Sequence, residues 1–146
     1  MSPLTIIFQV VCAFIGVVTL AVLFQIPKEY LLYAGITGAG GWLVELIVLE
    51  VSESPTFSAF WASLFVAVLS QIFARVSKAP VTVYLVTGIL PLVPGVGMYR
   101  TVYYLIRNNS ELTSYYFSYT LQIAGMIALA IFVVDSFMKI LYRKHG

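Results

Sequence analysis

The chain has 146 residues, of which 61% are hydrophobic and only 10% are charged. A soluble domain carries about 25% charged residues, so this composition excludes an ordinary soluble protein and indicates an integral membrane protein. The net charge of +2 and the lack of a basic stripe exclude nucleic acid as a partner. One cysteine and one histidine allow neither a disulfide within the chain nor a metal cluster.

The first apolar run predicts a transmembrane helix rather than a signal peptide. Its apolar core from Leu4 to Ile26 is too long for a signal sequence, and no Lys or Arg precedes it. Cys12 lies inside this run, where we expect a small buried hydrophobic residue. Pro27 is expected to end the helix.

The second apolar run is rich in glycine. Ala34 with Gly38, and Gly35 with Ala39, have the spacing of small residues that lets two membrane helices approach closely. Helix packing is the favoured interpretation of these glycines. The alternative is a hinge or a close approach to a ligand.

Glu45 lies within the second run. A carboxylate is costly to place in hydrocarbon, so a residue of this kind is by default a candidate for function. Burial disfavours its charged form, which suits proton exchange. Glu45 is therefore our candidate for proton coupling. The alternative is that it reaches water at the outer surface, because Glu50 and Glu53 follow.

The fourth apolar segment, residues 81–106, is interrupted by the sequence PLVPGVG at residues 91–97. Pro91 and Pro94 remove backbone donors and clash with the preceding turn, and we expect Gly95 and Gly97 to let the chain turn. A break at membrane depth survives only where protein buries it or where it lines a polar cavity. Since broken helices form the substrate sites of many transporters, we expect a substrate site here.

Arg100 follows the break and falls in the first turn of a helix that restarts near Gly97. A helix start offers free N–H groups and the positive end of the helix dipole. The planar guanidinium of arginine can bind a carboxylate through two parallel hydrogen bonds. The alternative is that Arg100 extends to the outer headgroups. The candidate substrate-binding residues are Pro91, Pro94, Gly95, Gly97, Tyr99 and Arg100.

Charge asymmetry predicts the topology of the whole chain, which we expect to be a single membrane domain, residues 1–146. Five spans would place six basic residues on one side and one or two on the other, so the positive-inside rule puts the N-terminus outside and the C-terminus in the cytoplasm. A re-entrant fourth segment would leave four spans. Asp135 and Lys139 are expected to form an ion pair. The predicted all-α fold has spans at about 4–26, 30–51, 57–74, 81–106 and 113–138, the fourth one broken.

The order of these motifs resembles the threonine/serine exporter family. Residues 26–30 (IPKEY), 34–42 (AGITGAGGW) and 78–83 (KAPVTV) carry part of the likeness, and residues 91–101 (PLVPGVGMYRT) carry its most specific part. In particular the chain resembles the short, YjjB-like members, which correspond to the C-terminal membrane half of full-length exporters.

The resemblance implies a bacterial inner-membrane location and the export of small metabolites: threonine and serine, or dicarboxylates such as succinate for split members. It also implies a larger membrane subunit that matches the N-terminal half of the fused exporters. We therefore expect a subunit of a secondary exporter for small carboxylate-bearing metabolites, without a cofactor and in a homo- or hetero-oligomer. The alternative is a non-transporting assembly subunit whose partner holds the substrate. An enzyme is not expected, because no acid/base or metal set is present.

Overall fold

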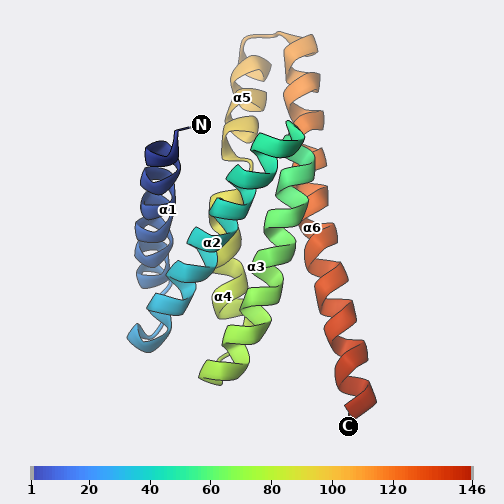
Figure 1. Ribbon diagram of the computed structural model, residues 1–146. Helices are drawn as coiled ribbons and strands as arrows, with labels where there is room; N and C mark the ends of the chain where they lie inside the picture. Colours follow the sequence, from blue (N-terminus) through green and yellow to red (C-terminus); the bar gives the residue numbers. More distant parts are fainter. Residues whose placement is uncertain (1, 146) are drawn as a thin grey trace.

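The computed structural model describes residues 2–145, and within that range the chain is helical with no strand (Figure 1). This confirms the predicted all-α membrane fold. The elements are α1 (Pro3–Leu23), α2 (Lys28–Ser52), α3 (Pro55–Ser77), α4 (Val81–Ile89), a short 3-10 helix η1 (Leu90–Leu92), α5 (Gly95–Ile106) and α6 (Ser110–His145).

Four of the helices, α1, α2, α3 and α6, are each long and apolar enough to cross a membrane. The segment Val81–Leu92 and helix α5 form a further pair that is bent by 53°. Figure 1 shows α5 continuing in the direction in which α4 runs, away from the end of the bundle at which α3 and α6 end. We keep five spans, the fourth one broken, as our proposal.

Local capping explains where the helices begin. Ser54 Oγ accepts a hydrogen bond from the Phe57 N–H (3.4 Å), and Pro55 occupies the first turn of α3. Asn109 Oδ1 accepts from the Leu112 N–H (3.1 Å) at the start of α6. Because this cap lies before the apolar run, α6 starts earlier than the predicted span, and it also continues past the predicted end to His145, so that it has 36 residues.

The glycines of α2 are packing positions, as the sequence favoured. A Cβ atom on Gly38 would collide with Val17 of α1, and one on Gly41 would collide with Val66 of α3. Gly88 of α4 is also crowded, since a Cβ there would come within 2.7 Å of Thr37 Cγ2 of α2 and within 2.8 Å of a Val66 methyl carbon. Small residues therefore bring α1, α3 and α4 close to α2.

Tyr84 is the largest fully buried side chain of the described core. Its hydroxyl shares a hydrogen bond with Ser77 Oγ (2.6 Å), so the polar end is satisfied. Tyr30, Tyr33 and Phe73 pack around its ring with centroids 6.1 to 6.3 Å away. Tyr84 is therefore a core residue between α2, α3 and α4.

The two halves of the broken span pack against different helices. Within the described chain, the backbone of α4 lies close to α1, α2 and α3 but not to α6, whereas the backbone of α5 lies close to α6 alone. Helix α3 also packs against α6. This arrangement leaves an opening between α4 and α6 and joins α5 to α6.

Cys12 is exposed on the surface of α1, so the prediction of a buried residue is wrong. The cause is the position of α1 at the side of the bundle, where only Val17 and Ala21 of this helix are buried. A hydrophobic run predicts burial in lipid or in protein, and it does not distinguish the two.

Candidate functional site at the helix break

The backbone of the fourth segment is interrupted where the sequence predicted it. Pro91 lies in the 3-10 helix, Val93 is extended (φ −60°, ψ 130°), Pro94 has φ −76° and ψ 59°, and α5 starts at Gly95. No described glycine has a positive φ. The turn is therefore made by Val93 and Pro94, and the conformational freedom that we expected of Gly95 and Gly97 is not used.

The break lies near the middle of the span. The 12 residues of Val81–Leu92 rise about 18 Å, which is roughly half of a hydrocarbon core about 30 Å thick. Pro94 precedes α5 without a side-chain cap, so the first N–H groups of α5 face the break. Leu92 is buried and anchors the break in the core formed by α3 and α6.

A hollow of about 430 Å³ lies beside the break, between α1 and α2. It is lined by Gln9, Cys12 and Ala13 of α1, by Trp42 of α2 and by Pro91. Gln9 brings an amide group, which can donate and accept hydrogen bonds, to the membrane interior. Sequence reasoning missed this residue, although it is the single amide side chain between Leu4 and Leu23.

The two glycines that follow the break differ in their surroundings. Gly97 is buried, and a Cβ atom there would collide with Thr120 Oγ1 of α6. Gly95 has open space around it. Gly97 thus permits close packing of α5 on α6, while Gly95 leaves the start of α5 accessible.

Arg100 extends from α5 toward α6 rather than toward the break. Since α5 starts at Gly95, Arg100 lies in its second turn, one turn later than expected. Its Nη1 atom donates to Tyr116 Oη (3.2 Å), and its guanidinium carbon lies 5.3 Å from the centre of that ring. Arg100 is therefore held by a cation–π contact and a hydrogen bond in this arrangement.

Tyr99 is exposed and belongs to a group of tyrosines on α5 and α6. Its ring stacks on Tyr103, with 6.0 Å between centroids. Tyr104 stacks on Tyr116 across the two helices, at 5.5 Å and nearly parallel. This aromatic contact, together with Arg100, holds α5 against α6, and it places Tyr99 outside the break.

Glu45 faces the protein. Ser58 Oγ of α3 donates a hydrogen bond to its Oε1 atom (2.9 Å), while Oε2 is buried without a hydrogen-bond partner among the described residues. Tyr119 of α6 lies within electrostatic range of both Glu45 and Arg100. Glu45, Ser58, Tyr119 and Arg100 thus lie in one region, which is separate from the hollow at Gln9 and Pro91.

Comparison with known proteins identifies the family. The sequence model described as "Threonine/Serine exporter, ThrE" matches residues 9–137. The chain belongs to the threonine/serine exporter family. It is accordingly a multi-pass membrane protein of a transporter family rather than a member of an enzyme family.

A relative of this family member is longer. The chain is 24% identical over 104 residues to an uncharacterized protein of Haemophilus influenzae, which covers 71% of this chain and 35% of the relative. The matched part is thus about a third of that protein's length. No solved structure matches the chain.

Proposed function

We propose that this chain is a subunit of a secondary exporter that moves small carboxylate-bearing metabolites out of a bacterial cell. The observation that carries the proposal is the mid-span break beside a hollow of about 430 Å³, within a member of an exporter family. Interrupted helices supply transporters with free backbone groups at membrane depth. The chain lies in the inner membrane, with its N-terminus outside and its C-terminus in the cytoplasm.

In this proposal the start of α5 binds the carboxylate. Its uncapped N–H groups and the positive end of its dipole favour an anion, and open space around Gly95 lets the anion approach. Arg100 supplies its planar fork after it leaves Tyr116, which holds it in the arrangement described. Gln9 hydrogen-bonds the polar end of the substrate, which is threonine, serine or a dicarboxylate such as succinate.

A second, larger membrane subunit completes the exporter. The matched segment is 35% of the Haemophilus relative. The rest of that longer chain has room for the membrane helices that a separate subunit would contribute to the exporter proposed here. Most of α1 is exposed, which leaves an apolar face available to a partner helix. We propose a hetero-oligomer in which this chain provides the broken span.

One observation favours the alternative of an assembly subunit. Arg100 is engaged by Tyr116, and no charged side chain lines the hollow. A subunit without a preformed anion-binding site can still support the assembly of a partner subunit that binds the substrate. The two functions differ in whether variants at the hollow change transport while the complex stays intact.

The test is reconstitution of the complex in liposomes. The chain is co-purified with the product of the adjacent gene, and efflux of labelled threonine, serine and succinate is measured. We expect Gln9→Leu and Arg100→Ala to reduce efflux without reducing co-purification. Arg100→Lys should be intermediate, because it keeps the charge and loses the fork. The control is Arg107→Ala, whose guanidinium lies over Tyr103 at the end of α5. Normal efflux in both test variants would support the assembly role instead.

A further inference from the structure

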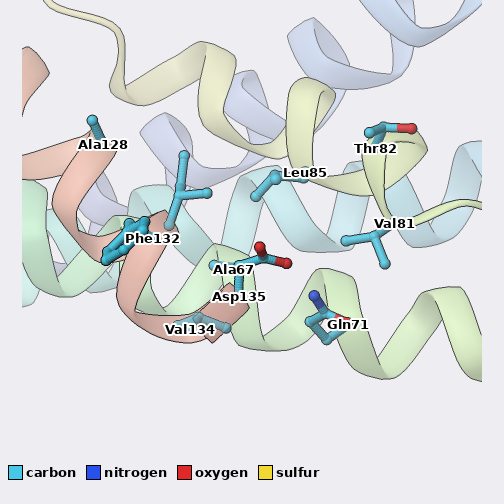
Figure 2. A pocket seen from close by; sticks show the side chains of 10 residues that line it. Ala67, Gln71, Val81, Thr82, Leu85, Ala128, Phe132, Val134 and Asp135 are labelled. Atoms are coloured by element: carbon cyan, nitrogen blue, oxygen red, sulfur yellow. The ribbon is translucent and has the colours of Figure 1, made fainter. Parts of the chain in front are cut away.

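A second and larger cavity lies between α3, α4 and α6, at the end of the bundle that carries the basic residues (Figure 2). Its volume is about 550 Å³. It exists because α4 and α6 both pack against α3 while their backbones stay apart from each other. The cavity is therefore a groove with α3 as its floor, and it opens sideways between α4 and α6.

The walls of the groove change from apolar to polar toward the basic end. Along α3, Ala67, Gln71 and Arg75 follow at intervals of four residues, so they share one face of the helix. Along α6, Asp135 and Lys139 have the same spacing. Figure 2 shows the Asp135 carboxylate and the Gln71 amide directed into the groove, while Leu85 and Phe132 lie farther from the basic end.

The rim of the groove carries more positive than negative charge. Lys139 Nζ lies 2.7 Å from Asp135 Oδ2, which neutralises the one carboxylate among the lining residues. Arg75 lies over the ring of Tyr142, 4.1 Å from its centre, and remains exposed. Lys78 is the C-cap residue of α3 and lies three residues before the start of α4 at Val81. Three cations and one carboxylate thus belong to the helix segments at this end of the groove.

The start of α4 adds to this positive potential. Pro80 provides no side-chain cap, and Val81 and Thr82 line the groove. The first N–H groups of α4 therefore lie at the rim without an intrahelical acceptor. The groove therefore has an apolar wall at one end and, at the other end, a positive electrostatic potential that favours an anion.

We propose that the groove binds an anionic glycerophospholipid, with an acyl chain against the apolar wall and the phosphate on Arg75, Lys78 and Lys139. Basic pockets between membrane helices recognise lipid headgroups in this way. A small polar metabolite would leave the apolar wall unfilled. A second copy of the chain in a twofold contact would bring its own basic rim against this one.

Native mass spectrometry of the full chain in mild detergent tests the headgroup contact. Dioleoyl phosphatidylglycerol and dioleoyl phosphatidylcholine are compared, since they share acyl chains and differ in charge. We expect phosphatidylglycerol to remain bound more strongly. Arg75→Gln and Lys139→Gln should each weaken its binding roughly fivefold, with little effect on phosphatidylcholine. Lys28→Gln, at the start of α2, is the control. Equal retention of the two lipids would overturn the proposal.

The groove itself is tested with a bulky substitution. Ala128 lines the groove and is exposed, so Ala128→Phe should fill the groove without disturbing the core. We expect it to lower the binding of phosphatidylglycerol, whereas Leu129→Phe, at an exposed neighbouring position that does not line the groove, should not. If Ala128→Phe instead separates a dimer and leaves lipid binding unchanged, a second copy occupies the groove and the proposal is wrong.

Asp135→Asn distinguishes a phosphate from an amine. If the phosphate is the ligand, loss of the carboxylate frees Lys139, and binding of phosphatidylglycerol should be unchanged or tighter. If an ammonium group is the ligand, the same substitution should weaken binding. Weaker binding of phosphatidylglycerol in Asp135→Asn would therefore contradict the proposed site.

Discussion

The two carboxylate oxygens of Glu45 lie in different surroundings. One carboxylate oxygen accepts a hydrogen bond from Ser58, and the other is buried without a partner in the described chain. A buried charge that lacks full hydrogen bonding is costly. An added proton, a water molecule or a movement of the helices would relieve that cost, so Glu45 remains our candidate for proton coupling.

We expect Glu45→Gln to flatten the pH dependence of export, because glutamine imitates the protonated acid at every pH. The measurement is efflux from liposomes as the external pH is varied. Glu53→Gln is the matched control, since Glu53 lies at the exposed C-terminal end of α2. An unchanged pH profile in Glu45→Gln, with normal expression, would mean that Glu45 has a structural role and takes no part in proton coupling.

Gly97 and Gly95 should respond in opposite ways to the addition of a methyl group. Gly97→Ala should destabilise the protein by about 1–3 kcal/mol through overpacking against Thr120. Gly95→Ala has open space and should be neutral or stabilising by about 0.4–1 kcal/mol. Thermal unfolding in detergent measures both.

The double variant Gly97→Ala with Thr120→Ala provides the check. It removes the oxygen atom that the new methyl group would meet, so it should recover part of the stability lost in Gly97→Ala. Equal losses in the single and double variants would show that the contact with Thr120 is not the cause.

At the scale of elements, the sequence predicted the break but not its geometry. Pro91 and Pro94 exclude a continuous helix wherever the segment packs, so the interruption follows from local chemistry. The packing of α5 against α6, at Gly97 and Thr120, involves residues far apart in the sequence, which no local pattern reveals. For the same reason the sequence placed Arg100 at the break, whereas Tyr116 binds it on another helix.

The same reasoning explains which parts of the candidate site were missed. Gln9 lies 82 residues before Pro91 in the sequence, and only the tertiary fold brings the two together. Ser58 follows a loop and looks like an ordinary polar residue near a helix start. By contrast the Asp135–Lys139 pair depends on one helix alone, and the structure confirms it at 2.7 Å.

If water enters the hollow beside the break, Cys12 should react with a charged, membrane-impermeant thiosulfonate reagent. Thiols react as thiolates, which form only where water reaches them, and Cys12 lines the hollow near the middle of α1. We expect Gln9→Leu to slow the reaction.

The control for this measurement moves the thiol along the same helix. In the background of Cys12→Ala, Thr19→Cys places it at an exposed position of α1 outside the hollow. It should react more slowly than Cys12. Failure of Cys12 to react, or equal rates at both positions, would indicate a dry hollow.

At the scale of the whole molecule, five spans should place the basic end in the cytoplasm. Lys28, Lys78 and Lys139 lie where α2 begins and where α3 and α6 approach their ends, which is the same end of the bundle in Figure 1. A reporter fused after the last residue should behave as cytoplasmic, and one inserted after Asn108 should behave as external. A cytoplasmic signal after Asn108 together with an external signal after the last residue would mean that the fourth segment is re-entrant.

We also expect that the active form is not a monomer. Most of α1 and much of α6 are exposed, so five spans of this size enclose little interior for a polar path. Native mass measurement in mild detergent should show an oligomer or a complex with a larger subunit. A stable monomer that transports by itself would contradict this expectation.

The division of the broken span between two sets of contacts has a mechanical consequence. Helix α4 packs against α1, α2 and α3, whereas α5 packs against α6. Any rocking of α6 on α3 is therefore transmitted to α5 and must be absorbed at Val93 and Pro94, the joint between the two bodies. Such rocking would change the distance from the start of α5 to Gln9, and so it would alternately offer and withdraw the anion-binding end of a helix. Rigid-body motion of this kind is how many secondary transporters alternate access.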